Sequence, residues 1–221
     1  MLAYPVNDKP IDYSKKVFMQ PKLDGVRCLI QYDEGKVTAY SRTGKEWKNI
    51  DHILYNLKPF FILNPDVILD GELYNHDLKD NFEKIVSLVR KQKPTDKDRA
   101  ESAEMVQFHC YDIVDENKTF EERKTFITQV VFRNHCIHHV STMYCASDYD
   151  AKEIHEVNLM CGFEGSILRT NDTYACKRSH NLRKFKDFHD TEATITGWVE
   201  GKGKRKGTIG KFLAIDADGI E

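Results

Sequence analysis

The segment MQPKLDGVRCLI, residues 19–30, places a lysine in a polar turn directly before an apolar run. Lys22 follows a proline, and Asp24 and Gly25 are residues that favour turns. Arg27 then leads into branched and aromatic residues, which predict a strand. A lysine at this position is either an ordinary surface residue or a nucleophile. A nucleophilic role requires that burial or neighbouring cations help the ammonium to lose its proton.

Strand-like runs recur along the chain, and most are bounded by Gly, Asp, Asn or Pro. They predict strands over residues 26–32, 36–42, 66–74, 106–114, 136–144, 165–170 and 182–188. Amphipathic helices are predicted from Phe82 to Val89, over 120–132 and over 150–162, whereas 90–104 is predicted to be a polar loop or a short exposed element. Short turns between neighbouring strands favour antiparallel sheets with helices packed outside, which is an α+β fold.

The composition is that of an ordinary soluble globular protein, with 40% apolar and 31% charged residues in a chain of 221. No apolar run is long enough to cross a bilayer, and the polar N-terminus lacks the apolar core of a signal peptide. The six cysteines form no CxxC pair, and several lie in apolar stretches, which predicts buried, reduced thiols. We therefore expect a cytoplasmic protein without a membrane partner.

A basic segment near the C-terminus contrasts with the overall net charge of −2. Residues 177–211 contain ten Lys or Arg and four Asp or Glu, so this segment carries +6 and the remainder −8. Such a segment suits either a polyanion partner or a solvated turn. The composition also shifts near residue 190, after which the order strand, basic Gly-rich turn, strand predicts a hairpin. Because a lone hairpin is barely stable, we expect domains over 1–189 and 190–221, the second being the start of a small β-barrel.

Four more motifs place charged groups beside the predicted strands: Ser41-Arg42-Thr43-Gly44, Asp70-Gly71-Glu72-Leu73, Tyr111-Asp112 and Glu164-Gly165. Lys184 and Lys186 follow, and in a strand they would point to the same face. Glu72 and Glu164 border apolar runs, where a carboxylate without a cation or hydroxyl partner is costly. Convergent lysines, an arginine, two carboxylates and an aromatic residue are typical of a pocket for a nucleoside triphosphate and a hard divalent metal ion.

In their order along the chain these motifs resemble those of the ATP-dependent DNA ligases. That family belongs to the covalent nucleotidyltransferases, which include mRNA-capping guanylyltransferases and RNA ligases. The resemblance covers residues 20–188, and the stretch that follows is similar to the opening of the ligase OB-fold domain. It implies an adenylation domain, ATP as adenylyl donor, Mg²⁺ or Mn²⁺, and nicked duplex DNA as the partner of a monomeric enzyme.

The resemblance also implies a role for each residue of the nucleotide site. Lys22 would attack the α-phosphate of ATP to form a lysyl-AMP. Gln20 would read adenine through its backbone, and Tyr111 would stack on the base. The ribose would be held by Glu72 and Arg27. Contact with the α-phosphate would come from two lysines, Lys184 and Lys186.

Metal and DNA sites follow from the same resemblance. Glu164, together with Glu72, would bind the metal ion, and Arg42 would bind the 5′-phosphate at the nick. The AMP would pass to that 5′-phosphate, and a 3′-hydroxyl would then displace it. Further DNA contacts are assigned to the four cations of the basic turn, Lys202, Lys204, Arg205 and Lys206.

Several alternatives stay open on the sequence. A capping-type guanylyltransferase would use GTP, an RNA ligase would seal RNA strands, and a noncatalytic nick-binding module would bind DNA without a covalent nucleotide. The EGSILR segment favours a DNA ligase, and the presence of Lys22 with both carboxylates argues against a binding module. A zinc site is not expected, because a group of five His and Cys residues matches no tetrahedral ligand pattern: His135, Cys136, His138, His139 and Cys145.

The C-terminal region carries one further expectation. The last motif of the family, which helps to orient the pyrophosphate leaving group, would lie beyond Glu221. If the chain is complete, we expect it to react poorly with ATP while keeping a preformed adenylate. The compact N-terminus suggests a phage, viral or bacterial enzyme.

Overall fold

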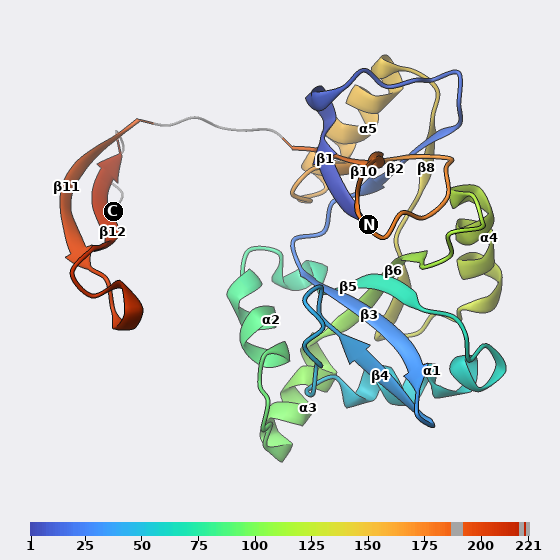
Figure 1. Cartoon of the computed structure of the whole chain (residues 1–221), viewed down its shortest axis with the longest axis horizontal. Helices are drawn as coiled ribbons and strands as arrows, with labels where there is room; N and C mark the ends of the chain where they lie inside the picture. The colour runs from blue at the N-terminus through green and yellow to red at the C-terminus, as the bar shows by residue number, and fades with distance from the viewer. Residues whose placement is uncertain (187–191, 217–218, 220–221) are drawn as a thin grey trace. The chain divides into compact units, whose positions relative to one another are not determined.

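The computed structural model describes residues 1–186, 192–216 and 219, and its contacts divide the chain into two units, Met1–Lys186 and Asp187–Glu221. The first unit contains two five-stranded sheets flanked by helices, and the second contains a two-stranded hairpin (Figure 1). The predicted domain boundary between 189 and 190 lies outside the described residues. Within the described ranges, the helices are too short or too polar to cross a membrane.

One face of the first sheet packs against α5 (Asp148–Met160). Its strands are, in spatial order, β1 (Leu2–Pro5), β10 (Arg178–Phe185), β9 (Ser166–Thr170), β2 (Val17–Pro21) and β8 (Met143–Cys145). All neighbouring strands are antiparallel except β1 and β10, which are parallel. Ile154 of α5 packs against Val17, Met19 and Leu168, so α5 covers the face from which β2 and β9 project these side chains.

The second sheet is covered by most of the remaining helices. Its strands are, in spatial order, β4 (Lys36–Tyr40), β3 (Val26–Asp33), β5 (Leu69–Tyr74), β6 (Gln107–Ile113) and β7 (Ile137–His139). Only β6 and β7 are parallel. Three helices share a core with this sheet, namely α1 (Asp51–Leu63), α2 (Phe82–Val89) and α4 (Phe120–Val130). Buried side chains such as Leu57, Phe61 and Leu88 stabilise this layer by roughly 1.5–3 kcal/mol each.

The α+β fold and the helices over 82–89, 120–132 and 150–162 are confirmed, with α5 starting two residues earlier than predicted. A single strand over 136–144 is wrong, because β7 and β8 fall in different sheets. A purely antiparallel arrangement is also wrong, since each sheet has one parallel pair at its edge.

Of the two predictions left open for 90–104, the short exposed element is the one that forms. It is α3 (Asp96–Met105), which Thr95 and Asp98 begin with a reciprocal capping box. Other elements had no matching prediction. Neither α1 nor the strands β1 and β2 were predicted, and three-residue 3₁₀ turns follow β1 and β5 at Val6–Asp8 and His76–Leu78. Four of the six free cysteines are buried, as predicted, while Cys161 and Cys176 are exposed.

The second unit is a hairpin of β11 (Ala193–Glu200) and β12 (Ile209–Asp216). A short 3₁₀ turn, Gly203–Arg205, lies in the basic connection between them. The hairpin itself is confirmed, whereas its place in an OB-fold stays a prediction.

Candidate active site

Lys22 lies where the chain leaves β2 of the first sheet and enters β3 of the second. Its backbone N–H donates to the carbonyl of Gly165 (2.9 Å), and the N–H of Glu164 donates to the carbonyl of Lys22 (3.3 Å). Three residues later, a Cβ on Gly25 would lie 2.5 Å from the carbonyl oxygen of Leu73. Only glycine therefore lets this crossing pass so close to β5.

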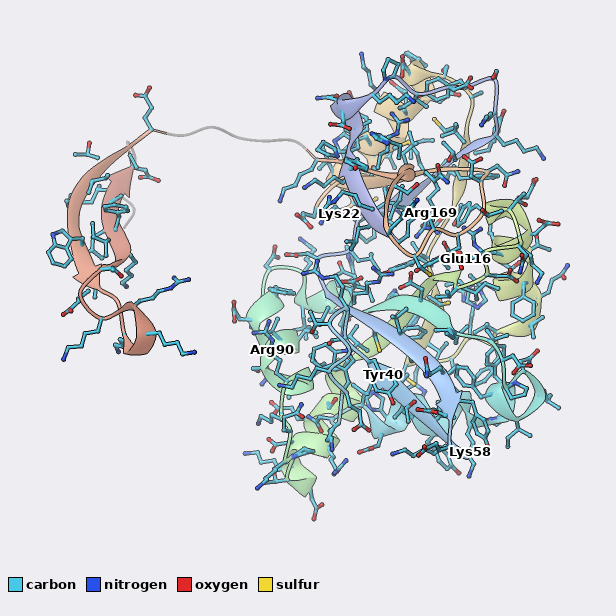
Figure 2. The ribbon with its side chains drawn as sticks, in the orientation of Figure 1. Lys22, Tyr40, Lys58, Arg90, Glu116 and Arg169 are labelled. Carbon is cyan, nitrogen blue, oxygen red and sulfur yellow. The ribbon has the colours of Figure 1, made fainter. Side chains whose placement is uncertain are left out.

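A cleft of about 620 Å³ opens at this crossing and is lined by both sheets. Figure 2 shows Lys22 and Arg169 at the level where the two sheets meet. Six residues assigned to nucleotide or DNA in the sequence line it: Gln20, Lys22, Arg27, Arg42, Glu72 and Tyr111. This volume falls in the range of small-molecule sites in proteins.

Glu164 joins two lysines beside the cleft. Glu164 forms an ion pair with Lys22. It forms a second ion pair with Lys186, whose Nζ lies 2.6 Å from Glu164 Oε1. Burial pushes the pKa of Glu164 upward, but hydrogen bonds from Lys186 and Lys22 outweigh this and lower the pKa below its ordinary value. Glu164 is consequently ionised at neutral pH, and it holds both lysines at one point.

A second carboxyl group, that of Asp24, lies close enough to Glu164, Lys22 and Lys186 for their charges to shift its pKa. The pKa of Asp24 is raised by burial and then by the negative charge of Glu164, so the two groups sense each other. Within the described ranges, no three His, Cys, Asp or Glu residues are arranged to hold a metal ion. This donor set fits Mg²⁺, which usually takes one or two carboxylates and completes its shell with water and substrate phosphates.

Glu72 has different electrostatics. Burial and then the charge of Asp70 raise its pKa to about 8, so the carboxyl group is largely protonated at neutral pH. The hydroxyl of Tyr111 lies 3.5 Å from Glu72 Oε2. A neutral carboxyl group hydrogen-bonds a hydroxyl well and binds a cation poorly, which favours the predicted ribose role of Glu72 over its predicted metal role.

The guanidinium group of Arg27 donates hydrogen bonds to three residues of the protein. Asp70 accepts two hydrogen bonds from it, at 2.9 and 2.8 Å, and the Tyr174 hydroxyl accepts a third at 2.9 Å. The carbonyl of Met1 accepts another at 2.7 Å. Arg27 therefore lines the cleft in a fixed orientation.

A buried charge network supports the base of the cleft. Asp112 accepts hydrogen bonds from Arg123 and Arg169, and all three side chains are at most 4% exposed. Arg169 Nε also donates to Gln20 Oε1 (2.6 Å), and its guanidinium carbon lies 5.3 Å from the centre of the Tyr111 ring. The network links the two sheets, because Asp112 belongs to β6 and Arg169 to β9.

Not every predicted site residue reaches the cleft. Lys184 lies opposite Ile167 in the first sheet and makes no ion pair within the described part of the chain. The four cations of the basic turn belong to the second unit.

Sequence reasoning assigned no role to Asp70, Asp112 or Arg169, although all three lie inside the motifs. Asp70 and Asp112 could have been found because they lie in the same motifs as the predicted site residues Glu72 and Tyr111. Arg169 could have been found because it ends the EGSILR segment. Lys45 and Arg90 also line the cleft, but neither lies in one of the motifs identified in the sequence.

Comparisons with known proteins agree on one family. Residues 1–186 match the family model described as ATP dependent DNA ligase domain. A DNA ligase of African swine fever virus is 28% identical over 202 residues, covering 86% of this chain and 46% of the relative. A DNA ligase of Methanosphaera stadtmanae is 25% identical over 217 residues, covering 90% of this chain and 38% of the relative. The chain thus spans less than half the length of these curated relatives.

Solved structures show the same fold. A Lig E DNA ligase, described as binding DNA with a minimal scaffold, aligns with a TM-score of 0.76 at 24% identity, covering all of this chain and 80% of that chain. The Chlorella virus DNA ligase-adenylate aligns with a TM-score of 0.64 at 21% identity, covering all of this chain and 82% of that chain.

Proposed function

Because the chain belongs to the ATP-dependent DNA ligase domain family, we propose that it seals nicks in duplex DNA through a lysyl-AMP intermediate on Lys22. The observation that carries the proposal is that Glu164 pairs with both Lys22 and Lys186 beside the cleft. This arrangement places the proposed nucleophilic amine and a second lysine at one point. Phosphoryl transfer needs mainly such positioning and charge neutralisation.

The proposed reaction has three steps at phosphorus. The Lys22 amine, having lost its proton to solvent, attacks the α-phosphorus of ATP, so that a P–N bond forms and the bond to pyrophosphate breaks. A 5′-phosphate oxygen of the nick then attacks the same phosphorus, and the Lys22 amine leaves. The 3′-hydroxyl oxygen finally attacks the 5′-phosphorus, its proton is lost to solvent, and AMP departs. Lys186, whose Nζ lies 2.6 Å from Glu164 Oε1, would help to neutralise charge on the phosphates.

In this proposal four residues that line the cleft hold the nucleoside: the backbone of Gln20 and the ring of Tyr111 hold adenine, and Glu72 and Arg27 hold the ribose. The α-phosphate is assigned to Lys186, which pairs with Glu164 beside the cleft, and to Lys184, which does not line the cleft. The fixed guanidinium of Arg27 and the neutral carboxyl of Glu72 support the ribose assignment, since neither has to reorganise when a neutral hydroxyl binds. Glu164 would hold Mg²⁺ or Mn²⁺ together with the phosphates, and the ion would supply charge neutralisation there.

The DNA assignments are part of the same proposal. Arg42 would bind the 5′-phosphate at the nick, and the basic turn of the second unit would bind backbone phosphates. Residues 1–189 would act as the adenylation domain and 190–221 as the start of an OB-fold domain, in a cytoplasmic monomer. The exposed, basic turn supports a polyanion partner.

Intact-mass measurement of the full chain tests the proposal most directly. We expect a gain of one AMP after incubation with Mg²⁺ and ATP, following pretreatment with pyrophosphate to remove any bound AMP. The Lys22→Ala variant should show no gain, because it lacks the nucleophile. Lys58→Ala is the matched control, since Lys58 is exposed on α1 and lies away from Lys22 (Figure 2), and it should gain AMP as the wild type does.

Other results of the mass measurement would indicate a different function or a different nucleophile. A gain of GMP from GTP instead would assign the chain to the capping branch. No gain with either nucleotide, together with salt-sensitive binding of nicked DNA, would identify a noncatalytic binding module. An AMP gain that persists in Lys22→Ala would contradict the assignment of the nucleophile.

A further inference from the structure

Three exposed cations, Arg42, Lys45 and Arg90, line the cleft without an ion pair in the described part of the chain. The inner cations of the cleft differ, because Lys22 is paired with Glu164, Arg27 with Asp70 and Arg169 with Asp112. Positive charge at the rim is therefore not compensated by protein carboxylates. We call Arg42, Lys45 and Arg90 the rim cations.

The first two rim cations are held by a tight turn after β4. The N–H of Ser41 donates to the carbonyl of Lys45 (2.8 Å), and the N–H of Gly44 donates to the carbonyl of Ser41 (2.9 Å). The Ser41 hydroxyl also accepts a hydrogen bond from the N–H of Lys45 (3.0 Å). These bonds fix the backbone of the turn, so the positions from which Arg42 and Lys45 extend are set.

Arg90 reaches the same rim from the end of α2. Asn49, which is 1% exposed, donates to the carbonyl of Leu88 (3.0 Å) and so fixes the end of α2 against the segment that follows the turn. Gln92 adds a long contact to the carbonyl of Glu46 (3.5 Å). Two segments far apart in sequence thus bring their cations to one cleft wall.

We propose that Lys45 and Arg90 bind a backbone phosphate of the 5′-phosphorylated strand, next to the 5′-phosphate that Arg42 would bind. This inference rests on the proposed function, and it adds the residue that caps α2 to the DNA site. The α-phosphate of the nucleotide already has Lys22 and Lys186 as partners, whereas the rim cations are exposed and unpaired. A DNA strand supplies a row of phosphates to such a rim, and an arginine can bind each in a bidentate manner.

Binding of nicked duplex by the full chain tests the inference, with a dideoxy 3′ end at the nick to prevent sealing. We expect Arg90→Ala to raise the Kd about 3–10-fold and to reduce the slope of log Kd against log salt by about 1. Arg133→Ala is the matched control, because Arg133 is exposed and does not line the cleft, and its slope should equal that of the wild type. Arg90→Lys should restore the slope, since it keeps the charge.

A single uncharged methylphosphonate, scanned along the first three linkages of the 5′-phosphorylated strand, locates the contact. At one linkage it should weaken binding by the wild type and leave Arg90→Ala unaffected. Equal weakening of both proteins at every linkage would overturn the assignment. So would an Arg90→Ala variant that binds DNA normally but is slowly adenylated, because Arg90 would then serve the β- and γ-phosphates of the nucleotide.

Failure of the proposed function would look different. A wild-type chain that gains no AMP contradicts the ligase proposal, but the salt slope and the methylphosphonate scan still decide whether Arg90 contacts a DNA phosphate. A wild-type chain that is adenylated yet has no affinity for nicked duplex would overturn the rim assignment alone.

Discussion

At the scale of single residues, Glu72 shows how its surroundings change the chemistry of a carboxyl group. The folded chain raises its pKa from 4.5 to about 8 through burial and the nearby Asp70. Folded protein therefore keeps this proton to a higher pH than unfolded protein does. The contribution of Glu72 to the free energy of unfolding therefore falls as the pH rises from 4.5 to about 8 and then levels off.

Glu72→Gln should remove this pH dependence, because the amide has no proton to lose. We expect the variant to have a higher Tm than the wild type at pH 8.5, by about 2–4 °C for each kcal/mol regained, and a much smaller difference at pH 5. Thermal unfolding at the two pH values measures both. Glu116→Gln is the control, since Glu116 is exposed and the same comparison should give no difference at either pH. A Tm gain that is equal at pH 5 and pH 8.5 would contradict the raised pKa.

Single residues also show how far the sequence alone reaches. Lys22, Glu72 and Tyr111 could be picked out from their motifs, and the structure places all three at one cleft. The partner of Arg27 could not be picked out, because the guanidinium group meets Asp70 only when β3 pairs with β5 in a particular register. Which carboxylate is neutral also depends on burial, and burial is a property of the folded chain.

At the scale of elements, Asp112 holds β6, α4 and β9 together through Arg123 and Arg169. A buried carboxylate with two arginines adds little net stability compared with apolar packing, but removing it leaves buried charges without a counter-ion. The network also positions Gln20 through Arg169. Its loss should therefore affect stability and nucleotide binding together.

Two substitutions show how much Asp112 and Arg169 each contribute to stability. Asp112→Asn should lower the free energy of unfolding by about 3–5 kcal/mol, because two guanidinium groups lose their carboxylate. Arg169→Met should cost clearly less, since Asp112 keeps its hydrogen bonds with Arg123, at 2.7 and 3.2 Å. Urea unfolding of both variants measures the difference. Equal costs would contradict this prediction, because the Asp112–Arg123 pair would then preserve no stability once Arg169 is replaced.

Element prediction failed where a local pattern was ambiguous. The run over 136–144 has strand-forming residues throughout, yet its two halves pair with different sheets, which only the tertiary structure specifies. Helix α1 contains Pro59, a residue that usually argues against a helix interior, and none of its thirteen residues was assigned to an element. By contrast, α2 was predictable because its apolar residues recur on one face and remain buried in the core.

At the scale of the whole molecule, the proposed DNA contacts are divided between the two units. The basic turn of the hairpin is closed by its own backbone: the N–H of Gly201 donates to the carbonyl of Thr208 (2.9 Å), and the Glu200 carboxylate accepts the N–H of Gly207 (2.8 Å). The Glu200 carboxylate therefore accepts a backbone hydrogen bond and is not paired with a lysine of the turn. The exposed cations of the turn, Lys202, Lys204, Arg205 and Lys206, make no ion pair within the described ranges.

Replacing these four cations with glutamine should weaken binding of nicked duplex without unfolding the chain, because they are exposed and outside the core. Each phosphate contact that is lost should reduce the slope of log Kd against log salt by about 0.9, so a fully engaged turn predicts a fall of about 3–4. The matched control replaces four exposed lysines of the first unit, Lys58, Lys93, Lys97 and Lys152, which changes the net charge by the same amount. If general charge attraction governs binding, the two variants will have equal slopes. If the turn contacts the backbone directly, only the turn variant will lose slope, because counterions are released only where phosphates are neutralised at close range.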